Sequence, residues 1–184
     1  EFSKLKFGSV NYDIKSDELL FPKIEVKEEE KFLLDLKVGK VLSVEDHPDA
    51  EKLLVIQVDL GKEKRQIVAG VKGHYSDADL VGRNIVVVTN LKYAKLRGKE
   101  SQGMLLAASD VKDKKIVLVS ALESKPGDVV KLEGKDNNKD QIKIEQFFEL
   151  KMLVKDKNVT VDGEVLKTEK EVLSVDGEDG WRVR

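Results

Sequence analysis

The sequence predicts a mainly β protein: a five-stranded barrel with one short helix, followed by a small α/β extension packed on it. Three observations predict this class. Apolar and polar residues alternate with a period near two from Leu36 to Val44. Short runs rich in β-branched residues recur at Leu53–Leu60, Arg65–Ala69 and Ile85–Thr89. Gly, Pro, Asn and Asp separate these runs, as in tight turns.

The order of the elements narrows the class to a barrel of the OB type. Three strands come first, with Gly61 at the tight position of the hairpin between the second and the third. A short helix over Ser76–Val81 follows, in which Asp79 completes the spacing of a capping box. Ile85–Thr89 and Ser101–Ser109 supply the fourth and fifth strands. Three strands, a helix and two strands are the order of an OB barrel.

The chain divides into three predicted regions. Residues 1–33 form an N-terminal tail that is dense in charge, and its apolar cluster Leu19–Ile24 docks either on this domain or on a neighbour. Residues 34–133 form the barrel. Residues 134–184 form an extension that begins with a polar linker and contains a helix over Ile144–Leu153. Because such a segment is small for an independent domain, we expect it to pack on the barrel.

Composition and motifs argue against several classes of function. The 184 residues contain no cysteine, which excludes disulfides and thiolate metal sites. His47 and His74 fit no metal-ligand spacing and are predicted to be turn or surface residues. No phosphate-binding loop or nucleophile motif occurs, and the carboxylates are scattered. We therefore expect no catalytic residues, no metal and no cofactor. Without a long apolar run or a signal segment, we expect a cytoplasmic protein with no membrane partner.

One segment has the composition of a nucleic-acid contact. The chain has a net charge of −2, but basic residues outnumber acidic ones within residues 34–133, above all at Asn90–Glu100. This segment follows the fourth strand, and the loop at that point flanks the ligand face of an OB barrel. Cations neutralise phosphates, and Tyr93 offers a ring for base stacking. From charge alone, an ordinary solvated loop is the alternative. The cations are Lys92, Lys95, Arg97 and Lys99.

A series of motifs runs through the barrel region in a fixed order: Asp35–Val41, His47–Leu53, Val58–Gly61, Arg65–Gly70, Gly82–Arg83, Asn90–Lys92, Lys95–Gly98 and Ser101–Ala108. Together they resemble the tRNA-binding domain of methionyl-tRNA synthetases, of free-standing bacterial tRNA-binding proteins and of endothelial-monocyte-activating polypeptide II. The resemblance implies an OB barrel and a tRNA ligand. The contacts that it implies are Asn90, Lys92, Lys95, Arg97, Ser101, Gln102 and Met104, with Lys52 and Arg83 as further contacts. For Met104, a core position is the alternative.

Two further resemblances concern the ends of the chain. Leu20–Glu25 is similar to the segment that follows the anticodon-binding helices of methionyl-tRNA synthetases, which implies a C-terminal piece of such an enzyme. The tail from Ile142 resembles the extra C-terminal domain of the activating polypeptide. That resemblance implies that residues 134–184 cover the surface through which shorter relatives dimerise, and so imitate a dimer partner. The implied covering residues are Phe147, Phe148, Met152 and Trp181.

These resemblances lead to one expected function and two alternatives. The expected function is a non-catalytic tRNA-binding module of a synthetase, methionyl-tRNA synthetase above all, which raises the local tRNA concentration at the catalytic domain. Its partners are tRNA and the catalytic part of that enzyme or other synthetases. We expect a monomer, with a homodimer as the alternative. The other functions are a released, cytokine-like signalling fragment with a motif around Leu33–Gly39, and a scaffold that binds synthetases.

Overall fold

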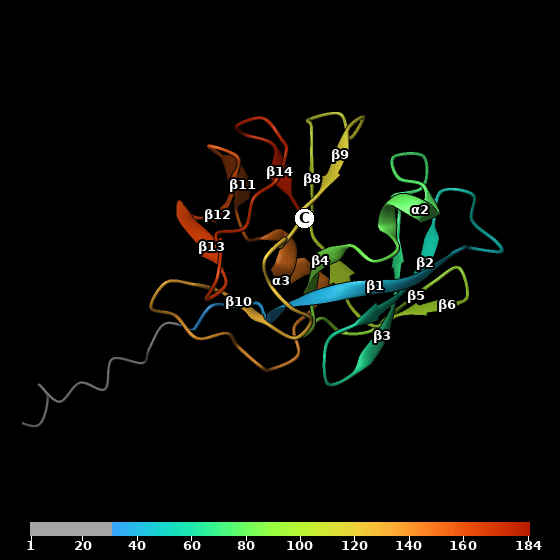
Figure 1. Ribbon diagram of the computed structural model, residues 1–184, viewed down its shortest axis with the longest axis horizontal. Helices are drawn as coiled ribbons and strands as arrows, with labels where there is room; N and C mark the ends of the chain where they lie inside the picture. The colour runs from blue at the N-terminus through green and yellow to red at the C-terminus, as the bar shows by residue number, and fades with distance from the viewer. Residues whose placement is uncertain (1–30) are drawn as a thin grey trace, which may run out of the picture. The chain divides into compact units, whose positions relative to one another are not determined.

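The long strand β1 (Leu36–Asp46) organises residues 31–184, the part of the chain that the computed structural model describes (Figure 1). It pairs antiparallel with β2 (Leu54–Asp59) and with β4 (Asn84–Val88), while β2 pairs with β3 (Lys64–Ala69). Its pairing with β2 shifts register between Val41 and Ser43. Such a bulge bends a strand, which lets β1 serve two neighbours of a closed sheet. The motifs expected at Leu19–Ile24 and Leu20–Glu25 lie outside the described residues.

The barrel closes through the segment after β4. β7 (Met104–Leu105) pairs with β4, and the backbone N–H of Gln102 donates to the carbonyl of Gln66 in β3 over 2.8 Å. The path β3-β2-β1-β4-β7 therefore returns to β3. The helix α2 (Asp77–Leu80) lies between β3 and β4 in the sequence, and Ser76 and Asp79 form the predicted capping box. The prediction of a mainly β fold is confirmed, and the antiparallel sheet is consistent with an OB-like barrel.

The predicted fifth strand, Ser101–Ser109, is wrong as a single element. The structure divides it into β6 (Lys99–Ser101), β7 and β8 (Ala107–Ser109). A side chain at Gly103 would place its Cβ 2.8 Å from the carbonyl oxygen of Val88, so the backbone passes close to β4 there. Beyond β7 the chain changes partners, and β8 pairs with β9 (Ile116–Leu118) and β14 (Arg182–Val183).

The extension joins the barrel sheet at two places. β10 (Val129–Leu132) pairs with β1 and also with β13 (Glu164–Lys167) of the extension. β13 pairs with β12 (Asn158–Val161), and β12 pairs with β11 (Met152–Lys155). β14 then links β11 to β8. In Figure 1 the orange and red strands of the extension therefore continue into the barrel through β8 and β10.

The predicted helix over Ile144–Leu153 is wrong in its second half. The helix α3 (Ile144–Phe148) ends early, and the chain enters β11 at Met152. Met152 and Val154 are buried, while Lys155 is exposed, which is the alternation of a strand. Pairing with strands on both sides determines the extended conformation of this segment, because strand formation depends on the packing context more than on local propensity.

Two hydrophobic clusters form the core. One lies within the barrel and contains Ile56 and Ile67. The other joins Leu36 and Val86 of the barrel to residues of the extension, including Leu166. Residues 134–184 thus pack on the barrel through a shared core, as expected. The boundaries at 33/34 and 133/134 stay predictions. No helix among residues 31–184 is long and apolar enough to span a bilayer.

The proposed covering residues behave differently from one another. Phe147 and Met152 are each only 1% exposed and belong to the cluster shared with the barrel. Trp181 is half-buried and packs against the same cluster. Phe148, in contrast, is 59% exposed. Its side chain takes no part in that core, which distinguishes Phe148 from the other three residues of the predicted covering set.

Candidate nucleic-acid interface

The basic segment is a β-hairpin and not the open loop that we predicted. β5 (Ala94–Leu96) pairs with β6, apart from the main sheet, and Lys95 lies opposite Glu100. Arg97 and Gly98 form the turn with φ of 51° and 90°. Two consecutive residues with positive φ are typical of a type I′ turn, whose twist matches that of the flanking strands. We call residues 91–101 the basic hairpin.

The basic hairpin presents its cations to solvent. The side chains of Lys92, Lys95, Arg97 and Lys99 are all exposed. Its carboxylate, Glu100, accepts a hydrogen bond from Nε2 of Gln102 over 3.2 Å. Tyr93 and Leu96 are also exposed, at 46% and 38%. Cations beside exposed apolar groups suit a ligand with phosphates and bases.

His47 fixes the tip of the basic hairpin. Its Nδ1 accepts a hydrogen bond from the backbone N–H of Asp49 over 3.0 Å. Its Nε2 lies 2.9 Å from the carbonyl oxygen of Leu96. Because Nδ1 is an acceptor in the neutral ring, the proton is on Nε2, and this nitrogen donates to Leu96. The buried imidazole therefore ties the β1–β2 turn to the hairpin.

Arg65 fixes the base of the basic hairpin. Its NH1 donates to the carbonyls of Thr89 and Gln102 over 2.7 and 3.0 Å, and its NH2 lies 2.9 Å from Oε1 of Glu63. The guanidinium carbon lies 5.7 Å from the centroid of the Tyr93 ring. Cation–π contact at this distance favours one orientation of Tyr93. The Arg65 side chain thus holds both the segment that enters the hairpin and the segment that leaves it.

Asn90 has a structural role. Its side chain is buried, and Oδ1 accepts a hydrogen bond from the N–H of Asp35 over 2.9 Å. Nδ2 lies within 3.1 Å of the carbonyl oxygens of Leu33, Asn138 and Asp140. An amide engaged in this way has no donor left for a ligand. These contacts favour a structural role for Asn90, which connects the segment before β1, the end of β4 and the linker, and its contact with RNA stays an untested prediction.

Ser101 is also structural, whereas Gln102 and Met104 lie at the edge of the surface. Oγ of Ser101 is buried, accepts from the N–H of Val68 and donates to the carbonyl of Gly103. These contacts favour a structural role for Ser101 as well, and its contact with RNA stays an untested prediction. Oε1 of Gln102 accepts from the N–H of Gln66 over 3.1 Å. Met104 is half-buried against the core, so both of its predicted roles remain open.

The two further predicted contacts fall in different places. Lys52 is exposed in the β1–β2 turn, which His47 joins to the hairpin. Arg83 follows α2; its guanidinium donates to Oγ of Ser120 over 3.2 Å and lies 5.2 Å from the Tyr75 ring. The structure thus gathers Lys52, Lys92, Lys95 and Arg97 on connected loops. It gives Arg83 partners elsewhere.

The sequence did not single out Arg65 or His47 as supports of the site. Each carries one local signal. Arg65 lies in the polar first half of β3, and His47 directly follows β1 and precedes a proline. Neither signal predicts which residue is contacted, since the contacts of Arg65 with Thr89 and of His47 with Leu96 span 24 and 49 positions of the sequence.

Comparisons with known proteins give the family. A family profile described as "Putative tRNA binding domain" matches residues 36–129, slightly more than half of the chain. The methionine–tRNA ligase of Thermococcus onnurineus is 59% identical over 85 residues, which cover 46% of this chain and 12% of that protein. The methionine–tRNA ligase of Pyrococcus horikoshii is 49% identical over 112 residues, covering 60% of this chain and 16% of the relative.

The solved C-terminal domain of Plasmodium vivax p43 is similar over a longer stretch. It superposes with a TM-score of 0.74 at 27% sequence identity, covering 82% of this chain and 96% of that domain. The likeness therefore extends beyond the barrel into the extension. Together with the profile match across β1 to β10, these findings show that the chain belongs to the family described as "Putative tRNA binding domain".

Proposed function

We propose that this chain is a non-catalytic tRNA-binding module that holds tRNA on the basic hairpin. The observation that carries the proposal is the placement of Lys92, Lys95 and Arg97, exposed on a hairpin whose tip and base are fixed by His47 and Arg65. Fixed cations lose less conformational freedom on binding than cations of an open loop. Family membership supplies the ligand class.

The proposed mechanism is recognition of backbone and shape. Lys92, Lys95 and Arg97 neutralise phosphates, and Tyr93 stacks on an exposed base. Lys52 adds a cation from the β1–β2 turn. Gln102 and Met104 border the same surface and contribute from its edge. Such contacts position tRNA with modest sequence discrimination. Arg83 contributes least, because Ser120 and Tyr75 already hold its guanidinium.

The proposed partner is the catalytic part of a methionyl-tRNA synthetase. The matched segments span 12% and 16% of the relatives named methionine–tRNA ligase, so the chain represents a small part of proteins of that kind. A tethered binding module raises the local concentration of tRNA at a catalytic domain without adding a contact to it. The extension supports a monomer in which Phe147 and Met152 cover the barrel surface.

The signalling alternative has no support in the fold. It requires an accessible motif around Leu33–Gly39. Leu34, Leu36 and Val38 of that segment are 0% exposed and belong to the cluster shared by the barrel and the extension. A receptor therefore has no linear motif to bind at this place while the barrel is folded.

The test is a tRNA titration of the wild-type chain and of the variant K92A/K95A/R97A at several salt concentrations. We expect the variant to bind more weakly and the slope of log affinity against log salt to fall by about 1 for each phosphate that is no longer neutralised. The matched control is K143A/K155A/K157A, which removes three exposed cations from the extension. Equal affinities of the hairpin variant and the wild type would refute the site.

A further inference from the structure

An aromatic ring lies exposed between the barrel and the extension. Phe147 and Phe148 are neighbours in α3, with ring centroids 5.6 Å apart and planes at 70°. Phe147 is buried in the shared core and holds Phe148 by this edge contact, while Phe148 is 59% exposed. Single exposed apolar side chains are common on protein surfaces, so the hollows and the charges around Phe148 decide whether it belongs to a binding site.

Two hollows adjoin Phe148, and we call them together the Phe148 groove. One has a volume of about 620 Å³ and a wall formed by α3, the start of β11 and β14. The other, of about 300 Å³, is lined by the end of β3, β7 and Ile116. Phe148 and Arg184 line both, so the two hollows adjoin each other at these side chains. Volumes of about 300–1,000 Å³ are those of small-ligand sites.

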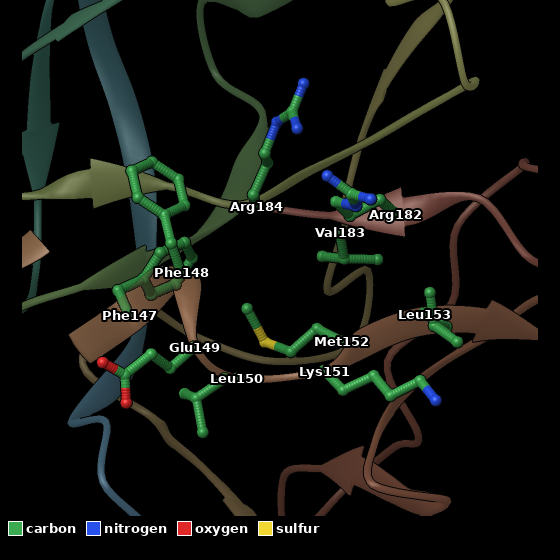
Figure 2. Close-up of a pocket in the computed structure, with 10 residues that line it drawn as sticks. All are labelled: Phe147, Phe148, Glu149, Leu150, Lys151, Met152, Leu153, Arg182, Val183 and Arg184. Atoms are coloured by element: carbon green, nitrogen blue, oxygen red, sulfur yellow. The ribbon is translucent and has the colours of Figure 1, made fainter. Parts of the chain in front are cut away.

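The charge of the groove suits a phosphate. Lys151, Arg182 and Arg184 line it together with a single carboxylate, Glu149. Figure 2 shows Phe148, Arg182 and Arg184 along the same side of the hollow, with Met152 and Val183 beneath them. In a chain with net charge −2, this is a local excess of positive charge. Arginine and an aromatic ring together form a platform for a nucleotide.

The Asp113 carboxylate neutralises part of this positive charge, because it pairs with Arg184. Its Oδ1 lies 2.6 Å from NH2 of Arg184, and Oγ of Ser109 donates to the same oxygen over 2.7 Å. The hydrogen bond from Ser109, reinforced by Arg184 and Arg182, holds the pKa of the Asp113 carboxyl below its usual value. Asp113 therefore stays ionised near neutral pH and competes with any phosphate for Arg184.

Residues of β3 and β7 connect the groove to the basic hairpin. The N–H of Val68 donates to Oγ of Ser101 at the end of β6, and Val68 also lines the groove. Met104, a predicted RNA contact, lines it too. The groove and the basic hairpin are therefore joined through β3 and β7. This proximity and the basic lining of the groove favour RNA as the occupant over a second protein.

We propose that the RNA surface extends into the Phe148 groove, where an unpaired base stacks on Phe148 and its phosphate binds Arg182 and Arg184. The inference rests on the proposed tRNA binding and deepens it. It adds a single-stranded subsite, formed by the extension, to a hairpin that reads backbone and shape. Stacking on an aromatic ring accepts any base, so the subsite selects unpaired nucleotides and not a sequence.

The test compares F148A, F148L and F148Y in the full chain, with a labelled tRNA and a labelled blunt-ended RNA duplex as probes. We expect F148A to weaken tRNA binding roughly 5- to 150-fold, the range of one base–aromatic stack. F148L keeps an apolar side chain but no ring and is expected to match F148A. F148Y keeps the ring and is expected to bind as the wild type does. Duplex binding is expected to change less than about twofold in all three, because a duplex offers no unpaired base to stack.

Further variants separate the possible outcomes. R182Q is expected to lower the salt slope by about 1, and D113N to tighten binding, because it releases Arg184. L122A removes another exposed apolar side chain and is the control, while fluorescence of the single tryptophan, Trp181, reports folding. If F148A binds tRNA as the wild type does while the hairpin variant fails, the subsite is wrong and the proposed function stands. If the wild type binds no tRNA, both proposals fall. A change of sedimentation in F148A with unchanged RNA affinity makes the groove a contact between copies and overturns the subsite.

Discussion

The Asn90 side chain shows how a residue type suited to RNA serves the fold. Amides hydrogen-bond bases, and Asn90 lies next to the basic segment, so sequence reasoning placed it in the interface. In the structure its amide links Asp35, Leu33 and the linker. The sequence cannot separate these roles, because the burial depends on linker residues that lie 48 and 50 positions away.

Replacing Asn90 by alanine is expected to destabilise the fold by about 2–4 kcal/mol, since it leaves several buried backbone groups without partners. Urea unfolding measures this loss. The folded fraction is expected to keep its affinity for tRNA. Q141A, at an exposed position of the same linker, is the control. A variant of normal stability that has lost tRNA binding would restore Asn90 to the interface.

The exposure of the cations, in contrast to the burial of Asn90, was predictable from the sequence. Lys92, Lys95 and Arg97 have long charged side chains, which are rarely buried without a partner, so their exposure follows from their chemistry. Small polar residues such as Ser101 fit either the surface or the interior. The exposure of a residue is therefore predictable from sequence where its burial would be costly, and not where its burial is cheap. The contacts of Lys92, Lys95 and Arg97 with RNA stay a proposal.

Among the elements, β1 to β4 and α2 were predictable because local pattern and tertiary pairing agree there. Alternation, turn residues and the capping box of Ser76 all indicate the structure that forms. The segment 101–109 and the start of β11 were not predictable, since their form depends on partners distant in sequence. Gly103 approaches β4, and β11 lies between β12 and β14.

The turn before β10 links the barrel to the extension and carries a pH dependence. Oδ2 of Asp128 accepts from the N–H of Lys125 over 2.8 Å and pairs with Nζ of Lys170 over 3.0 Å. First the Lys125 hydrogen bond and then Lys170 lower the pKa of the Asp128 carboxyl. A group whose pKa is lowered by folding stabilises the protein above its unfolded pKa. This contribution is lost as the pH falls through the folded value.

The free energy of unfolding is therefore expected to fall as the pH drops below about 4, the usual range of carboxylates. D128N is expected to be less stable than the wild type near neutral pH and to show a shallower fall. Urea midpoints between about pH 5 and 2 measure both slopes. E51Q, which changes an exposed carboxylate of the β1–β2 turn, is the control. Parallel slopes for D128N and the wild type would contradict this role.

At the scale of the whole molecule, the shared cluster makes the barrel and the extension one packing unit. Leu166 of β13 is fully buried in the cluster that also contains Val86 and Val88 of β4. Sequence reasoning foresaw contact between the two regions from the small size of the extension. It did not foresee a common core, because that requires the pairing of β14 with both β8 and β11.

Replacing Leu166 by alanine is expected to destabilise the whole chain by about 2–5 kcal/mol, the usual cost of a large-to-small change in a core. The loss is expected to appear in the barrel as well as in the extension. Hydrogen exchange at the amides of Val86 and Val88 measures the effect in β4, and exchange within β12 measures it locally. Faster exchange confined to residues 134–184 would show that the two regions unfold independently.

The position of β14 has a consequence for synthesis on the ribosome. Of the described strands, β14 is made after all the others, yet it fills the gap between β8 and β11. Until it emerges, the nascent chain presents two unpaired strand edges over an incomplete core. Such edges pair readily with other chains. Chains truncated before Arg182 are therefore expected to aggregate even though the whole barrel sequence, residues 34–133, is present.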